Sequence, residues 1–133
     1  MRATFPGKAY VSLEDPRAFL GRFPRGALFE SLLVAEWLKH RYNRALAGNA
    51  FFWRDNVGNE IDLLLDHGRS LQAVEMKSGQ TPSGDYFAAL HRWIGWAGLR
   101  ARHPTVVYGG AHTMERGGAR LLSWREWPEG AIG

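Results

Sequence analysis

The segment from Glu60 to Lys77 constrains the fold more than any other part of the chain. Two runs, EIDLLLD and LQAVEMK, flank the sequence His67-Gly68-Arg69-Ser70. Apolar runs of this length around a short glycine-containing turn predict a β-hairpin, with Gly68 at the first central position of a type II′ turn. A symmetric hairpin pairs residues whose numbers sum to 137, so we expect Asp62 opposite Glu75 and Glu60 opposite Lys77.

This register brings charged side chains together inside two otherwise apolar strands. Opposed residues have Cβ atoms ~4.5–5.5 Å apart, and like charges at that separation are destabilising. Two opposed carboxylates therefore require a divalent cation, a shifted pKa or access to solvent. Alternation puts Glu75 and Lys77 on one face of their strand. A lysine there can contact the same water or phosphate as a metal ion held by Asp62, Glu75 and the backbone carbonyl of Met76.

A purely structural interpretation of the same residues stays open. E-x-K is a common tripeptide, and its significance depends on the strand that precedes it and on an earlier helix bearing Glu30. In the alternative, the charged residues form a solvated ladder across the hairpin: Glu60, Asp62, Glu75 and Lys77.

The remaining segments predict an α/β domain in which helices flank the hairpin. Apolar residues at helical spacing predict a first helix that buries Leu28, Leu32, Leu33 and Trp37. We expect Trp37, Trp93 and Trp96 to be core residues rather than platforms for stacked bases. The other predicted elements are a helix over 26–42, a strand over 50–54, a turn over 55–59, a helix over 85–96 capped by Asp85, strands over 105–108 and 120–124, and a glycine-rich turn over 109–118.

The amino-acid composition excludes several kinds of functional site. The absence of cysteine excludes disulfides, thiolate zinc sites and cysteine nucleophiles. No apolar run approaches the ~20 residues that span a bilayer, so we expect a cytoplasmic protein without a membrane partner. The net charge of +4 is compatible with nucleic acid as a partner. The five histidines are dispersed, which favours surface or loop roles over metal ligation.

Four segments carry a resemblance to a known family: GALFESLLVAEWLKHRY, FFWRDNVGNEIDLLLDHG, LQAVEMKSGQT and VVYGG…LLSWRE. Together they resemble the domain-of-unknown-function family numbered 4143 over residues 25–127. That domain usually follows an ATPase domain and is regarded as a member of the PD-(D/E)XK nuclease superfamily. The resemblance implies a restriction-endonuclease-like αβββαβ core, with a mixed central sheet flanked by helices, over residues 26–133.

The resemblance also implies roles for particular residues. Asp62 matches the superfamily's metal-binding aspartate, Glu75 its second acidic ligand and Lys77 its catalytic lysine, while Glu30 matches an accessory acidic residue of the first helix. The implied cofactor is Mg²⁺ or Mn²⁺. Arg54, at the end of the first strand, could meet a phosphate or form a salt bridge to Asp55 or Asp62. Two further residues follow the lysine in a loop that could face substrate: Ser78 and Gln80.

Residues 1–25 form an N-terminal extension of a different character. Asp15-Pro16 predicts the start of a short helix that ends near Leu20. The segment KAYVSLEDPRAFLGRFP is similar to part of the associated ATPase domain. The phosphate-binding loop is missing, because Gly7-Lys8 is followed by Ala9 and has no glycine five residues before it. We therefore expect a remnant of an ATPase domain that neither binds nor hydrolyses ATP.

The sequence thus predicts a Mg²⁺-dependent deoxyribonuclease-like domain, with DNA as its substrate and a homodimer or an ATPase as a further partner. The alternative is a catalytically inactive DNA-binding or protein-interaction module, derived from an ATPase-linked protein, that retains the acidic residues as a relic.

Overall fold

A mixed sheet forms the centre of the molecule. The structure is a computed structural model that describes residues 4–5, 8–12 and 26–131, with side chains from residue 26 onward. Its strands follow the order β1-β2-β3-β4-β5-β6-β8-β7. Strands β5, β6 and β8 run parallel to one another, and the other neighbours are antiparallel. The strands are β1 Thr4–Phe5, β2 Lys8–Ser12, β3 Ala50–Asp55, β4 Glu60–Asp66, β5 Leu71–Lys77, β6 Thr105–Tyr108, β7 Met114–Arg116 and β8 Ala119–Ser123.

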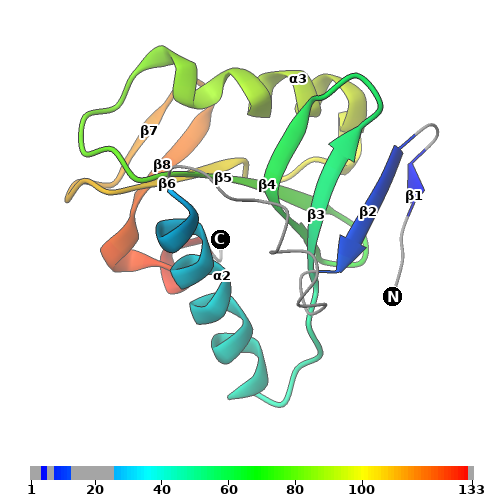
Figure 1. Cartoon of the computed structure of the whole chain (residues 1–133), viewed down its shortest axis with the longest axis horizontal. Coiled ribbons are helices and arrows are strands. Elements are labelled where there is room, and N and C mark those ends of the chain that lie inside the picture. The colour runs from blue at the N-terminus through cyan, green and yellow to red at the C-terminus, as the bar shows by residue number, and fades with distance from the viewer. Residues whose placement is uncertain (1–3, 6–7, 13–25, 132–133) are drawn as a thin grey trace.

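Among the described residues, two α-helices cover opposite faces of this sheet (Figure 1). Helix α2 spans Ala27–Tyr42, and helix α3 spans Ala88–Ala97. The predicted α/β class, with a mixed sheet flanked by helices, is confirmed. In the described part of the chain, short 3₁₀ helices complete the fold: η1 Gly84–Phe87, η2 Gly98–Arg100, η3 Trp124–Glu126 and η4 Glu129–Ala131. No helix among the described residues is long and apolar enough to cross a membrane.

Alternating side chains of the strands divide the core into two layers. The α3 layer contains Trp53, Ile61 and Leu64 together with Leu90 and Trp93 of the helix. The α2 layer contains the residues that alternate with them, with partners from the helix and from the C-terminal turns: Leu63, Leu65, Val74 and Met76 beside Leu33, Val34, Trp37 and Trp127. The indole Nε1 of Trp127 donates to the Leu33 carbonyl at 2.7 Å, which ties the C-terminal turns to α2.

Several predicted boundaries are confirmed, and three predicted core positions are wrong. The first helix, the hairpin strands and β6 lie where the sequence predicted them. Leu28, however, is 89% exposed and Leu32 46% exposed, because α2 turns Leu33, Val34 and Trp37 toward the sheet instead. Trp37 and Trp93 are buried as expected, whereas Trp96 is 47% exposed.

The second helix and the glycine-rich turn also differ from expectation. The segment predicted as one helix over 85–96 begins as the 3₁₀ helix η1, and Asp85 lies within its first turn while Ser83 holds the cap position. Part of the predicted turn over 109–118 forms β7, which pairs antiparallel with β8. The N-terminal extension contributes β2, which pairs with β3. The helix predicted from Asp15 to Leu20 lies outside the described residues.

Strand β4 carries a bulge at the position that the sequence analysis singled out. Phe51 pairs with Leu64, whereas Trp53 pairs with Ile61, so two steps along β3 correspond to three along β4. Asp62 and Leu63 together therefore stand opposite a single residue of β3. A bulge bends its strand and re-aims the side chains beside it. Both Ile61 and Leu64 consequently face the α3 layer despite an odd spacing.

Candidate active site

The predicted hairpin register is confirmed, and it ends one step before the two acidic residues. Leu63 pairs with Val74, and each following pair also sums to 137 as far as Asp66 and Leu71. Gly68 in the turn has a φ of 87°, in the left-handed region that favours glycine. Asp62 and Glu75 are next in line, but the two strands no longer form a regular ladder there.

Where the β4–β5 ladder ends, carboxylate side chains take the place of backbone carbonyl groups as hydrogen-bond acceptors between the two strands. The N–H of Asp62 donates to Oε1 of Glu75 at 3.1 Å, and the N–H of Met76 donates to Oδ2 of Asp62 at 2.9 Å. Each carboxylate therefore satisfies a backbone donor of the opposite strand, which would otherwise lie at a frayed end of the sheet. The two acids meet as predicted. The predicted pairing of Glu60 opposite Lys77 is not part of the β4–β5 ladder, because that ladder ends at Leu63 and Val74. Glu60 pairs with Arg54 of β3.

Burial and repulsion make Glu75 an unusual carboxyl. Its side chain is only 6% exposed, which is inconsistent with a solvated charge ladder at this position. Burial, followed by the negative charge of Asp62, raises the pKa of Glu75 to about 8. A hydrogen bond between the two carboxyl groups adds to the rise, whereas the charge of Lys77 opposes it. A positive charge placed between the two acids would lower the pKa of Glu75.

Lys77 and the backbone of Met76 complete the arrangement. The Nζ of Lys77 lies 3.6 Å from Oε2 of Glu75, and the lysine side chain is 36% exposed, so one end of the cluster reaches solvent. The N–H of Met76 points toward β4, and the carbonyl of a strand residue points to the same side as its N–H. The Met76 carbonyl thus faces the opening between β4 and β5.

Two glycines hold the loop that follows Lys77. The N–H of Gly109 donates to the carbonyl oxygens of Lys77 at 3.1 Å and of Gly79 at 3.0 Å. A Cβ on Gly109 would lie 2.3 Å from the Ser78 carbonyl oxygen, and one on Gly79 would lie 2.3 Å from the hydroxyl of Tyr86. Only glycine allows these approaches. The role of Gly109 in this loop was not predicted, because no sequence motif marks it.

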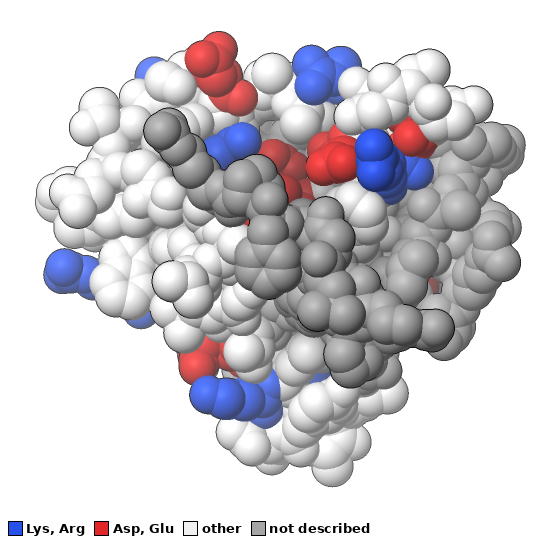
Figure 2. Space-filling model, in the orientation of Figure 1, with Lys and Arg blue, Asp and Glu red and all other residues white. Residues whose placement is uncertain are grey.

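The structure places the other predicted site residues around this cluster. Ser78 and Gln80 are exposed in the loop after Lys77. Arg54 is exposed and its Nε lies 3.3 Å from Oε1 of Glu60, so the salt bridge weighed with Asp55 or Asp62 is formed with Glu60 instead. Figure 2 shows acidic and basic side chains adjoining one another below α3 on the face drawn.

Glu30 lies in the first turn of α2, on the other helix layer. The start of α2 approaches the candidate site, because a Cβ on Gly26 would lie 3.9 Å from the Ser78 hydroxyl. In the described part of the chain, no three acidic or histidine side chains gather closely enough to share a metal ion.

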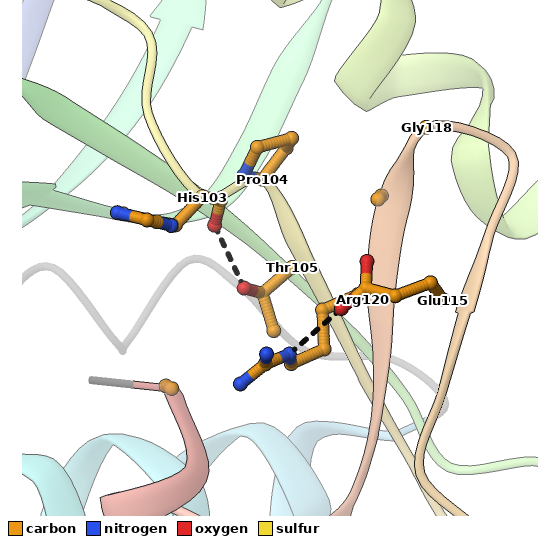
Figure 3. A pocket seen from close by; sticks show the side chains of 8 residues that line it. His103, Pro104, Thr105, Glu115, Gly118 and Arg120 are labelled. Atoms are coloured by element: carbon orange, nitrogen blue, oxygen red, sulfur yellow. Dashed lines mark hydrogen bonds and ion pairs between the residues drawn. The ribbon is translucent and has the colours of Figure 1, made fainter. Parts of the chain in front are cut away.

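A cavity of about 250 Å³ lies elsewhere, at the amino ends of β6 and β8 (Figure 3). The guanidinium of Arg120 reaches into it, but Nε of Arg120 contacts Oε1 of Glu115 at 3.1 Å and Nη1 donates to the Gly130 carbonyl at 2.9 Å. Asp62, Glu75 and Lys77 instead lie toward the carboxyl end of β5. Ligands of open α/β sheets bind at the carboxyl ends of parallel strands, which favours the acidic cluster over this cavity.

The cluster offers the donor set of a hard divalent cation. Mg²⁺ is usually held by one or two carboxylates, with water and substrate oxygens filling the remaining positions. Asp62, Glu75 and the Met76 carbonyl fit that description. An ammonium group 3.6 Å from one ligand can act on a substrate or water bound beside the metal.

Comparison with known proteins supplies the family. A family model described as domain of unknown function (DUF4143) matches residues 25–127, which include both helices, strands β3 to β8 and the acidic cluster. No curated protein matches the chain at a significant level. The chain belongs to the DUF4143 family.

Proposed function

We propose that this domain is a metal-dependent nuclease-like domain that hydrolyses phosphodiester bonds in DNA. The observation that carries the proposal is the reciprocal contact of Asp62 and Glu75, with Lys77 at 3.6 Å, at the place where β4 and β5 separate. The order of elements α2, β3, β4, β5, α3 and β6 supports a restriction-endonuclease-like core. It also supports membership of the PD-(D/E)XK superfamily.

In this proposal each residue has a defined task. Asp62 and Glu75, with the Met76 carbonyl, would hold Mg²⁺ or Mn²⁺, which supplies a Lewis acid and a lowered pKa for bound water. Lys77 would orient the attacking water or stabilise negative charge that develops on the phosphate. The bond broken is a P–O ester bond, with the oxygen of water added to phosphorus and a proton delivered to the leaving oxygen.

Substrate contacts are proposed for the residues that remain exposed beside the cluster. Ser78 and Gln80 lie directly after Lys77 on a loop anchored by Gly109, so the loop can present hydroxyl and amide groups at a fixed position. Arg54 can contact a phosphate only by sharing or leaving Glu60, because its Nε lies 3.3 Å from that carboxylate. Glu30 is proposed as an accessory group that acts through water.

A cleavage assay tests the proposal. Supercoiled plasmid and a labelled oligonucleotide are incubated with wild-type protein, with Mg²⁺, Mn²⁺ or EDTA. Lys77→Ala is expected to cleave at least ~100-fold more slowly, as loss of a group that stabilises transition-state charge does elsewhere. Asp62→Asn tests the metal ligand. Lys39→Ala is the matched control, because Lys39 is an exposed lysine on α2 whose only described ion pair is with Glu36.

The outcomes separate an enzyme from a binding module. Metal-dependent cleavage that Lys39→Ala retains and Lys77→Ala loses supports the proposal. Cleavage that survives both Lys77→Ala and Asp62→Asn contradicts the assigned site. A folded, metal-binding protein that cleaves no DNA contradicts the proposed hydrolysis and favours an inactive binding module.

A further inference from the structure

The outer face of α3 and η2 carries positive charge without any acidic residue. No Asp or Glu occurs between Asp85 and Glu115. Helix α3, η2 and the segment that leads into β6 all lie in this stretch. Arg92, Arg100 and Arg102 are exposed there. An uninterrupted cationic stretch on one layer of a domain attracts polyanions.

Two of these arginines have no carboxylate partner among residues 26–131. The ion pairs within that range involve neither Arg92 nor Arg102. Nη1 of Arg102 donates only to backbone carbonyls, that of Leu99 at 2.7 Å and that of Ala101 at 2.9 Å. These contacts fix the position of the guanidinium and leave its positive charge uncompensated. This distinguishes Arg102 from Arg54 and Arg120, which each contact a glutamate.

An exposed aromatic ring lies on the same helix as Arg92, four residues further along. Trp96 is 47% exposed, and its ring contacts that of Trp53 with centroids 5.3 Å apart and the ring planes tilted by 37°. Trp53 pairs with Ile61, the residue that directly precedes Asp62. Figure 1 shows α3 crossing the sheet from β7 toward β4 and β3, so the end of the helix with Trp96 lies over these strands. Glu75 and Lys77 alternate with residues of the α2 layer and so face the α3 side as well.

We propose that Arg92, Trp96 and Arg102, here called the α3 surface, bind a single strand of DNA on the side of the sheet that Glu75 and Lys77 also face. The arginines provide charge for phosphates, and the exposed indole provides a face on which a base can stack. A base in a duplex is already stacked on both sides, whereas a base in a single strand has a free face for Trp96. The inference rests on the proposed function for the choice of DNA, but binding to this surface requires no metal.

A titration in EDTA tests the inference separately from cleavage. Fluorescence anisotropy measures binding of labelled oligo(dT) to the full chain at low salt, with a duplex of the same length as the comparison. The variants are Arg92→Ala/Arg102→Ala, Trp96→Ala and Trp96→Phe. Arg125→Ala is the matched control, because Arg125 is an exposed arginine on η3, two residues before Trp127 of the α2 layer. Circular dichroism confirms that each variant is folded.

We expect wild-type protein to prefer oligo(dT) over the duplex. The double arginine variant should weaken oligo(dT) binding at least ~10-fold, and Trp96→Ala should weaken it ~5- to 100-fold, the range of a lost base–aromatic stack. Trp96→Phe should retain most of the affinity, and Arg125→Ala should change the affinity less than ~2-fold.

Three results would overturn the inference. The first is that the double arginine variant and folded Trp96→Ala both bind oligo(dT) as tightly as the wild type does. The second is duplex binding as tight as oligo(dT) binding, which would point to a duplex backbone as the ligand. The third is binding to phosphatidylserine vesicles without binding to oligo(dT), which would point to a membrane surface. A protein that binds oligo(dT) as expected but cleaves no DNA would contradict only the proposed hydrolysis.

Discussion

Nζ of Lys77 lies 3.6 Å from Oε2 of Glu75, yet the pKa of Glu75 is raised to about 8. The neighbouring ammonium therefore offsets only part of the effect of burial and of the Asp62 charge. The native domain without metal holds a proton on this pair at pH values where an unfolded glutamate, with a pKa near 4.5, has lost it. Both the stability and the metal affinity of the domain should depend on that proton.

The first prediction concerns stability without metal. A group whose folded pKa is raised contributes stability that is fully present below its unfolded pKa and is lost as pH rises through its folded pKa. The melting temperature in EDTA should therefore fall between about pH 4.5 and pH 8. The loss should be on the order of a few kcal/mol, at ~1.4 kcal/mol per pKa unit. Glu75→Gln should lack this component and be the more stable protein at pH 8.

Thermal melts of wild type and Glu75→Gln across this pH range check the prediction. Glu36→Gln, a change at a partly exposed glutamate on α2, is the control and should follow the wild type. Parallel wild-type and Glu75→Gln curves would show that Glu75 titrates normally.

The second prediction concerns metal binding. Mn²⁺ should raise the melting temperature of the wild type, and the increase should grow from pH 6 to pH 8 because a metal ligand must be deprotonated. A ligand at 100 times its Kd stabilises a folded protein by ~2.7 kcal/mol. Asp62→Asn should lose most of the increase while keeping an oxygen that can accept the Met76 N–H. A Mn²⁺ effect of equal size in Asp62→Asn would place the metal elsewhere.

The third prediction compares two glycines. Gly109→Ala would place a Cβ 2.3 Å from the Ser78 carbonyl oxygen, a backbone atom that cannot move without shifting the loop after Lys77. It should destabilise the domain by ~1–3 kcal/mol, as overpacking does, and reduce any cleavage activity. Gly95→Ala meets no atom within 4 Å on α3 and should stabilise the helix by ~0.5–1 kcal/mol. Melting temperatures and cleavage rates of both variants decide the comparison.

The fourth prediction distinguishes a structural role of Arg54 from a role in binding substrate. Its exposed ion pair with Glu60 should contribute less than ~1 kcal/mol, so neither Arg54→Ala nor Glu60→Ala should change the melting temperature much. If Arg54 contacts phosphate, Arg54→Ala should raise KM for DNA, whereas Glu60→Ala, which frees the guanidinium, should leave KM unchanged or lower it. An equal rise of KM in both variants would mean that the Arg54–Glu60 ion pair acts only by maintaining the structure of β3 and β4.

The hairpin and the pairing of its acids could be predicted because they depend on local rules. A short turn with Gly68 fixes the register, and the register fixes which residues meet. The departure from the ladder at Asp62 could not be predicted, because the bulge in β4 depends on the position of β3, which is set by packing over the whole sheet.

Helix faces were less predictable than strand positions. Apolar residues surround most of α2, so the sequence alone could not distinguish the buried Leu33 and Trp37 from the exposed Leu28 and Leu32. Trp96 shows the same difficulty: its spacing from Trp93 fits a buried face, yet its side chain is 47% exposed. The position of Glu30 relative to the acidic pair likewise depends on where α2 docks, which no local pattern encodes.

The extra residue in β4 divides that strand into two independently oriented halves. From Leu63 onward, strict alternation assigns side chains to the two core layers. Ahead of it, Ile61 and Asp62 follow a separate alternation. Removing one residue at this point would fuse the halves into a regular strand and send either the aspartate or the whole leucine series to the wrong side of the sheet. The acidic residue can therefore be aimed at the β4–β5 opening without altering the hydrophobic pattern that folds the rest of the domain.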